Sequence, residues 1–224
     1  MSPAAVLATL AGLAVYQSLA ATQTSAPLED DTEKSKTKWE FSLSTLTYLA
    51  QHARDYVNPN FTADRDWLHL EARYNYEALK TGSVWMGYNF QRFCIGKGLT
   101  VNATPMFGGV LGDITGVAPG YLIEASYKII KASTQGEYFF DAGNNSQDFF
   151  YSWSEFSASL PKADCVRAGL VVERTQASGN SDVRRGPLVG FEHKYKDKDV
   201  DLTIYWLAPG SREGTFVFGV TVDF

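Results

Sequence analysis

The sequence predicts an all-β protein, in which 10–12 strands close into an antiparallel, up-and-down transmembrane β-barrel. From Lys38 onward the chain is a series of segments of 9 to 13 residues in which apolar and polar residues alternate. Such alternation is typical of strands with two different faces. Aromatic residues make up 14% of the chain, yet the mean hydropathy is only −0.18. The segments also match the roughly 9–11 residues with which a tilted strand crosses a bilayer.

The first 38 residues have a different composition from the rest. Residues 4–21 form an apolar run of small residues that is too short for a membrane helix. Ser18 and Ala20 supply the small residues of a signal-peptidase site, and Thr24-Ser25-Ala26 offers a second one. We therefore predict a signal peptide at 1–20, cleaved near Ala20, a polar linker at 21–38 and a barrel at 39–224. A retained anchor helix is the alternative, because no basic residue precedes the apolar run.

Turn residues divide the barrel region into eleven candidate strands. Clusters such as Gly96-Lys97-Gly98, Ser178-Gly179-Asn180 and Pro209-Gly210-Ser211 stand between the alternating segments. The candidate strands are 39–48, 65–77, 82–93, 98–110, 120–130, 135–142, 147–159, 164–175, 186–196, 199–208 and 215–224.

Aromatic residues recur at the ends of the apolar faces, where membrane barrels place their aromatic girdles at the lipid–water boundary. Examples are Tyr74, Tyr76, Tyr88, Phe90, Tyr121, Trp206 and Phe224. Bulky Trp67, Trp85 and Tyr205 are expected on the opposite, polar face. A narrow barrel with such side chains inside has a filled or constricted lumen rather than a wide pore.

The polar face of the predicted strands contains charges of both signs. Each would cost on the order of 2–4 kcal/mol near the middle of the bilayer if it faced lipid. An unpaired charge in a dry soluble core would be at least as costly. In a polar lumen the charges can pair and hydrate, so a membrane barrel accommodates both faces. The residues predicted to face the lumen are His69, Glu71, Arg73, Glu124, Lys128, Arg167, Glu173, Glu192 and Asp201, with Lys194 and Asp223 on the same phase.

Thr215–Phe224 resembles the closing strand of bacterial outer-membrane β-barrel proteins: a final Phe is preceded by apolar residues at alternating positions. The resemblance implies location in the bacterial outer membrane, contact with its lipid, and recognition of this strand by the barrel-assembly machinery. The residues that match this assembly signal are Phe216, Phe218, Val220, Val222 and Phe224.

The resemblance also implies an even strand number, with both ends of the barrel chain on the periplasmic side. Eleven candidates violate this parity, and the ambiguous segment is 49–64. Either it contains a further strand, or the first segment lies outside the barrel. Counting back from Phe224 places loops 209–214, 176–185, 143–146, 111–119 and 78–81 outside, and turns 197–198, 160–163, 131–134 and 94–97 inside.

Composition and motifs narrow the function. A net charge of −5 and a pI near 5.2 do not favour nucleic acid as a partner. Cys94 and Cys165 have no second Cys or His at a metal-ligand spacing, so we predict no metal and no cofactor. A disulfide between them is not favoured, because they lie on strands well separated in order. His52 and His193 are interpreted as structural or interfacial residues.

Three functions remain. The first is a non-enzymatic outer-membrane barrel, either structural or a narrow channel for a small solute, with a mixed-charge lumen. The second is an outer-membrane lipid-modifying enzyme that uses His69 with Glu71 or a serine, for which Ser83 on the next strand is the nearest candidate. The third is a soluble periplasmic barrel that binds an apolar ligand.

Overall fold

The computed structural model describes residues 38–51, 54–90, 93–95, 98–143 and 148–224. The predicted signal peptide and nearly all of the linker, and His52, lie outside these described residues. The strands are β1 (Glu40–Ala50), β2 (Tyr56–Arg65), β3 (Leu68–Tyr74), β4 (Thr81–Tyr88), β5 (Phe93–Ile95), β6 (Leu99–Gly112), β7 (Gly116–Tyr127), β8 (Ile130–Asp141), β9 (Phe149–Leu160), β10 (Ala163–Ala177), β11 (Asn180–Tyr195), β12 (Lys198–Leu207) and β13 (Thr215–Asp223). None of the described residues forms a helix long and apolar enough to cross a membrane.

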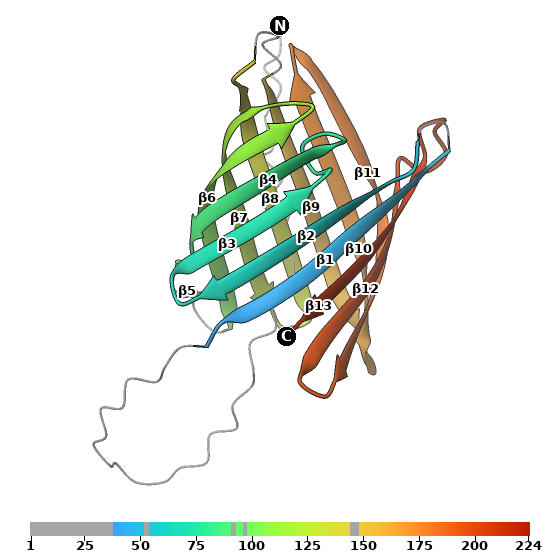
Figure 1. Cartoon of the computed structure of the whole chain (residues 1–224). Coiled ribbons are helices and arrows are strands. Elements are labelled where there is room, and N and C mark those ends of the chain that lie inside the picture. The colour runs from blue at the N-terminus through green and yellow to red at the C-terminus, as the bar shows by residue number, and fades with distance from the viewer. Residues whose placement is uncertain (1–37, 52–53, 91–92, 96–97, 144–147) are drawn as a thin grey trace, which may run out of the picture.

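Twelve of these strands close into an antiparallel barrel (Figure 1). Each strand pairs with its neighbour in the chain, β4 pairs directly with β6, and β1 pairs with β13. The short β5 pairs only with the start of β6, so it lies outside the ring. At the closing seam the backbone N–H of Phe224 donates to the carbonyl of Phe41 at 2.9 Å, and Phe41 returns a bond at 3.0 Å. The predicted all-β, antiparallel barrel is confirmed, at the upper end of the 10–12 range.

The additional strand required by parity is β2, inside the segment 49–64 that the sequence left ambiguous. Its inward residues are polar, and Val57 and Phe61 point outward, so the two-faced pattern is present. Pro59 obscures this pattern because proline is rare inside sheets. The ladder between β2 and β3 begins at Asn60, so Pro59 lies just beyond the end of that ladder.

The connections between strands alternate between the two ends of the barrel as the sequence predicted. Residues 75–80, 113–115, 142–148, 178–179 and 208–214 join strands at the end opposite Phe224. Several ranges differ from prediction. The β7–β8 turn is 128–129 rather than 131–134, and the 176–185 loop shrinks to 178–179 because β10 and β11 extend into it. Likewise 111–119 shrinks to 113–115, 78–81 becomes 75–80, and the predicted turn 94–97 overlaps β5.

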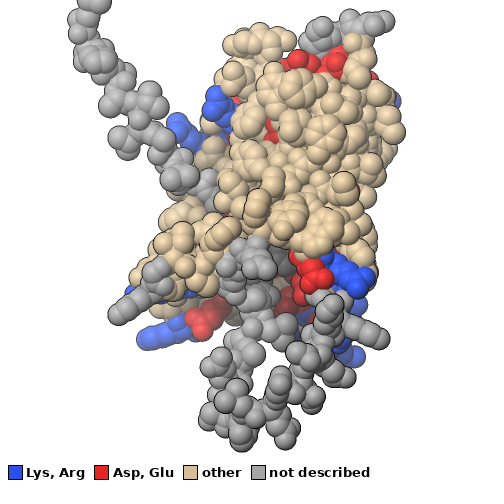
Figure 2. All heavy atoms as spheres, turned by 90° about the vertical axis from the view of Figure 1, so that its left-hand side faces the viewer, with Lys and Arg blue, Asp and Glu red and all other residues tan. Residues whose placement is uncertain are grey.

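The outer face of the barrel is apolar. Figure 2 shows one side as a broad surface without charge, with Lys, Arg, Asp and Glu gathered toward the two ends. The last strand illustrates the alternation: Phe216, Phe218 and Val220 are exposed, and Val217 between them is fully buried. An apolar belt of this kind stabilises a barrel in lipid and would destabilise it in water. It therefore contradicts the soluble alternative.

Three side chains, those of Trp67, Lys128 and Tyr76, do not lie on the face that the strand alternation predicted. The cause is that the strands do not begin or end at the residues expected. Asp66, Asn75 and Lys128 each adopt a positive φ, between 54° and 57°, and this left-handed conformation ends an extended strand. Trp67 therefore lies in the β2–β3 turn, 55% exposed, with its ring stacked on Tyr88. Lys128 lies in the exposed β7–β8 turn rather than in the lumen.

The third is Tyr76, which was expected in the outer aromatic girdle. Because β3 ends at Tyr74, Tyr76 belongs to the β3–β4 loop, and its side chain lines the interior. Of the other girdle positions, Tyr121 is only partly buried, and the rest are exposed: Tyr74, Tyr88, Phe90, Trp206 and Phe224.

Candidate functional site: a divided lumen

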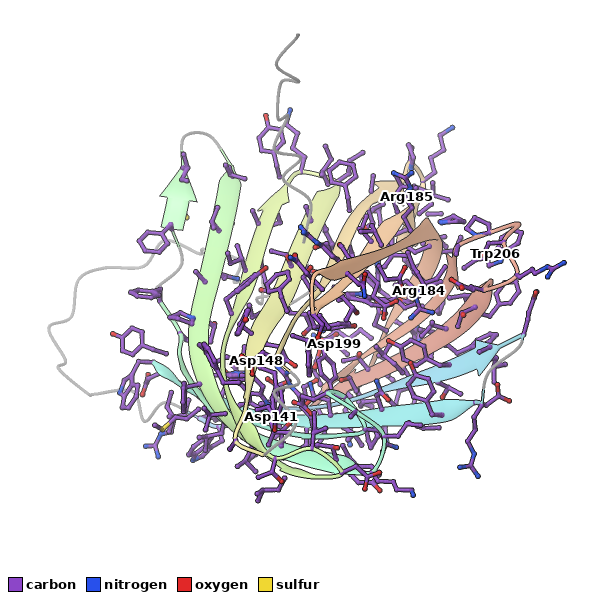
Figure 3. All side chains as sticks on the ribbon, turned by 90° about the horizontal axis from the view of Figure 1, so that it is seen from above. Asp141, Asp148, Arg184, Arg185, Asp199 and Trp206 are labelled. Carbon is purple, nitrogen blue, oxygen red and sulfur yellow. The ribbon has the colours of Figure 1, made fainter. Side chains whose placement is uncertain are left out.

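The lumen contains two cavities that open toward opposite ends of the barrel. The terminus-side cavity, of about 370 Å³, is lined by residues near the barrel end at which β1 begins and β13 ends. The loop-side cavity, of about 580 Å³, is lined by the β3–β4 loop and the far ends of β1, β9 and β10. In the view down the barrel of Figure 3, Arg184 and Asp199 lie inside the ring, whereas Trp206 points away from it. The linings of both cavities include Asn58 and Tyr76, so these two residues mark the boundary between them.

Tyr76 reaches across the lumen at this boundary. Its hydroxyl accepts a hydrogen bond from the side-chain amide of Gln135 on β8 at 2.5 Å. Its ring packs edge-on against Tyr151 of β9, with the ring centroids 5.6 Å apart. Because β8 and β9 belong to the wall opposite β3, Tyr76 ties the β3–β4 loop to the far side of the barrel.

Tyr76 thus forms a partition between the two cavities. Arg73 contacts this partition and forms a network with several buried charges. Its guanidinium donates to Glu71 of the same strand and to Glu137 of β8, each at 2.8 Å, and lies 4.0 Å from Glu77. The same guanidinium stacks on the rings of Tyr76 and Trp85, at 4.4 and 4.3 Å from their centroids. One cation thus balances several carboxylates while it holds the tyrosine ring.

The β3–β4 loop is also anchored at its base. The side-chain oxygen of Asn75 accepts the backbone N–H of Lys80 at 2.7 Å, and its amide donates to the carbonyl of Val57 at 3.0 Å. Ser83 donates to Glu77 at 2.5 Å. These bonds close the loop on itself, so Tyr76 is positioned by a compact turn rather than by a long free segment.

A second cationic centre, Arg167 of β10, lines the terminus-side cavity. Its guanidinium donates to Asp201 at 3.0 Å and to Thr203 at 2.6 Å, and it reaches Glu155 at 3.5 Å. Glu155 also accepts hydrogen bonds from Trp153 at 2.9 Å and Tyr205 at 2.8 Å.

Gly190 leaves the room that this guanidinium needs. A Cβ at that position would lie 2.6 Å from Nε of Arg167. Only glycine therefore fits beside the Arg167 side chain.

His69 faces two carboxylates. The sequence predicted one of them, Glu71, and the structure adds Asp64. Nδ1 of His69 lies 2.8 Å from Asp64, and its Nε2 lies 3.5 Å from Glu71. Ser83, the nucleophile that the enzyme hypothesis placed near it, instead bonds to Glu77 and accepts the indole N–H of Trp85. The geometry is that of a buried ion cluster, and it does not assemble the proposed serine–histidine pair.

Most of the residues predicted to face the lumen do so. His69, Glu71, Arg73, Glu124, Arg167 and Glu173 are all buried, each 7% exposed or less. Glu192 and Asp201 are partly buried and line the terminus-side cavity. Lys128 is the exception described above. Cys94 and Cys165 are free and exposed, and no group of His, Cys, Asp or Glu in the described part of the chain is arranged to hold a metal.

Several charged residues of the lumen were missed in the sequence. Glu137 and Glu155 are on strands whose alternation could have assigned them inward, since Phe140 and Phe156 occupy the opposite phase. Lys131, which pairs with Glu192 at 2.6 Å, was placed in a turn. Asp64 was in the ambiguous segment before β3.

Comparisons with known proteins place this fold among outer-membrane barrels. No family model matches the chain, and no curated protein matches it in sequence. The solved structure of the KdgM porin is similar with a TM-score of 0.52 and 8% identity, over 82% of this chain and 98% of that one. The KdgM porin in complex with disordered oligogalacturonate gives a TM-score of 0.50, with the same identity and coverage. Omp33, an outer-membrane protein of Acinetobacter baumannii, gives a TM-score of 0.44 at 8% identity, over 84% and 99% of the two chains.

Proposed function

We propose that this protein is a non-enzymatic, narrow channel for small solutes in the bacterial outer membrane. The observation that supports it most is the pair of cavities that enter the lumen from opposite ends and share Asn58 and Tyr76 in their linings. The two cavities therefore adjoin at Tyr76, and buried side chains fill other parts of the interior, so the path that we propose is narrow. The apolar outer face supports the membrane location, and the likeness to a porin fold agrees with a channel.

The partition limits what can cross. Twelve-stranded barrels lie between the eight strands that leave room only for side chains and the sixteen that enclose an aqueous channel. With Tyr76 and Arg73 across the lumen, inorganic ions and small flexible solutes are the permeants we expect. Folded or bulky substrates are excluded.

Single-channel recording in a planar bilayer tests the proposal. The purified barrel should insert and give small, uniform conductance steps in potassium chloride. Its folded state is checked by mobility on a denaturing gel before and after boiling, because closed barrels stay folded in detergent until heated. A barrel that is folded by this criterion and gives no conductance would contradict the channel and leave a structural role.

The targeting and assembly roles of the chain ends complete the proposal. Residues 1–20 act as the export signal, followed by the linker at 21–38. The alternating apolar residues from Phe216 in β13 to Phe224 just after it act as the signal for the assembly machinery. Their pairing with β1 across the seam is consistent with a strand that closes the barrel last. Replacing Phe218 and Phe224 together with Ser should lower the amount of heat-modifiable barrel in outer-membrane fractions.

A further inference from the structure

We infer that the terminus-side cavity binds aliphatic polyamines, as the solute class of the proposed channel. The inference rests on the proposed function for its physiological meaning, but binding itself does not require conduction. Its basis is a cavity with excess negative charge, two carboxylates that each have a buried oxygen and no ion-pair partner, and apolar side chains in the same lining.

The charge balance of the cavity lining is strongly negative. Among the described residues, eight lining side chains are Asp or Glu, and two are Lys or Arg. Arg167 and Lys194 are these two, and Arg167 is already engaged by Asp201 and Glu155. Just outside the lining, Arg73 pairs with Glu71 and Lys131 pairs with Glu192, and His69 of the lining lies between Asp64 and Glu71. The remaining carboxylates keep the balance negative. A narrow, low-dielectric cavity concentrates this field, so it attracts cations and repels anions.

Three of these carboxylates, Glu124, Asp164 and Asp223, form no ion pair with a described residue, and Glu124 and Asp223 each have a buried oxygen. Glu124 of β7 is 6% exposed, and its one hydrogen bond comes from the amide of Asn102 at 3.1 Å. The other oxygen of Glu124 and one oxygen of Asp223 are buried without a hydrogen-bond partner. Leaving a buried carboxylate without a partner is unfavourable, so a cation that enters the cavity gains by pairing with it.

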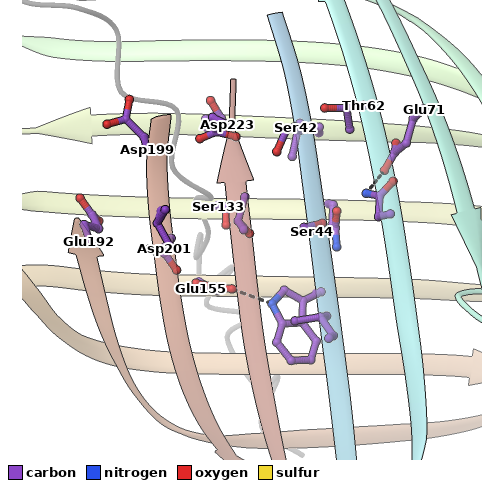
Figure 4. A pocket seen from close by; sticks show the side chains of 18 of the residues that line it. Ser42, Ser44, Thr62, Glu71, Ser133, Glu155, Glu192, Asp199, Asp201 and Asp223 are labelled. Carbon is purple, nitrogen blue, oxygen red and sulfur yellow. Dashed lines mark hydrogen bonds between the residues drawn. The ribbon is translucent and has the colours of Figure 1, made fainter. Parts of the chain in front are cut away.

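The arrangement of these carboxylates favours a long cation over a compact one. Asp223 ends β13, whereas Glu124 lies on β7, six strands away around the ring. Figure 4 shows Glu192, Asp199, Asp201 and Asp223 together at the ends of β11, β12 and β13, with Ser42 and Ser44 on the adjacent β1. No described group of carboxylates converges closely enough to hold a metal ion. Separate ammonium groups on one flexible chain can reach opposite walls.

Apolar side chains in the same lining can contact the methylene segments of such a chain. Leu46, Met106 and Leu122 line the same cavity, together with the ring of Trp153. Polyamines alternate charged ammonium groups with short apolar segments, and burial of these methylene groups against such a surface is favourable. Acidic and uncharged sugars would leave the carboxylates unpaired.

Isothermal titration of the full, detergent-folded barrel with spermidine tests the inference. We expect saturable binding by the wild type and roughly tenfold weaker binding by Glu124→Gln, which keeps the size of the side chain and its bond to Asn102. Asp223→Asn is the second variant, in case Glu124→Gln lowers the yield of folded barrel. Asp113→Asn removes an exposed carboxylate at the opposite end of the barrel and should bind spermidine like the wild type.

Three results would overturn the inference. They are no saturable binding by the folded wild type, an affinity that Glu124→Gln and Asp223→Asn leave unchanged, and displacement of spermidine by equal concentrations of Mg²⁺. The last result would mean that the cavity attracts any divalent charge. Conductance is measured separately, so a barrel that conducts without binding spermidine retains the channel and loses the polyamine site. A barrel that binds spermidine and does not conduct retains the polyamine site and loses the channel.

Discussion

Two regions of the lumen, the Arg73 network at the partition and the mouth of the terminus-side cavity, balance their charges in different ways. At the partition, Arg73 is surrounded by Glu71 and Glu137 at 2.8 Å, and its guanidinium is sandwiched by aromatic rings. At the terminus side, Glu124 and Asp223 have no cation, and the exposed Lys194 lies 3.4 Å from Asp199. At the partition, each nearby carboxylate shares the cation Arg73. At the terminus side, Arg167 pairs with Asp201 and Glu155, but Glu124 and Asp223 remain without a cation and leave charge available to whatever enters.

This contrast indicates which interactions stabilise the barrel and which act on solutes. Buried pairs that lose one member leave an uncompensated charge, and this is expensive. Hydrated pairs at a mouth contribute little to stability but shape the electric field in the pore. Substitutions at the partition should therefore change stability and pore size, and substitutions at the terminus side should change selectivity.

The largest effect is expected from Arg73→Met. The substitution keeps an apolar contact with the rings but removes the cation shared by three carboxylates, so unfolding should require about 3 kcal/mol less free energy. Urea titration of tryptophan fluorescence in detergent measures it. A second variant, Arg73→Met with Glu137→Gln, should recover part of the loss. A single variant as stable as the wild type would show that the network is hydrated.

The next effect concerns the pore. Tyr76→Ala removes the ring at the boundary of the two cavities, and unit conductance should rise roughly twofold or more as the constriction widens. Planar-bilayer recording measures the step size. Tyr138→Ala removes a ring from the outer face and is the matched control. Equal conductance for all three proteins would place the constriction elsewhere.

A smaller effect is expected on selectivity. In a gradient of potassium chloride the wild type should show a reversal potential that favours K⁺ over Cl⁻. Glu124→Gln should lower the permeability ratio by roughly twofold, because one charge of several in the cavity is lost. Asp113→Asn should change it little, since its carboxylate is exposed and screened. A wild-type preference for anions would contradict the account of the terminus-side cavity.

The smallest effect is expected for Lys194→Ala at the terminus-side mouth. The Lys194 side chain is 59% exposed, so its pair with Asp199 should contribute less than about 0.5 kcal/mol to stability. The same urea titration that detects the Arg73 variant measures it. A loss of stability as large as that of Arg73→Met would contradict the difference that we draw between the Arg73 network and the mouth of the terminus-side cavity.

Much of the barrel could be predicted from alternation alone. The strand period of two assigns each side chain to a face, so His69, Glu71 and Arg73 could be placed in the lumen without a structure. The same rule located the outward Phe216 and Phe218. Parity then pointed to residues 49–64 for the missing strand, which is β2.

The remaining features depend on interactions that no local pattern contains. Asn75 and Lys128 end their strands in a left-handed conformation without a glycine to signal it, so the segment 65–77 was predicted too long. Tyr76 consequently faces the lumen instead of lipid. The bond between Arg73 and Glu137 joins strands four apart in the ring, and only the closed barrel brings them together.

The most direct test of the channel uses the native Cys165, which is free and lines the terminus-side cavity. In a Cys94→Ser background, a positively charged methanethiosulfonate reagent is added during single-channel recording. If solutes pass through the lumen, labelling of Cys165 should reduce the unit conductance and its preference for cations, and Cys165→Ser should be insensitive. Complete labelling of Cys165, confirmed by mass, with unchanged conductance would contradict a permeation path through this cavity.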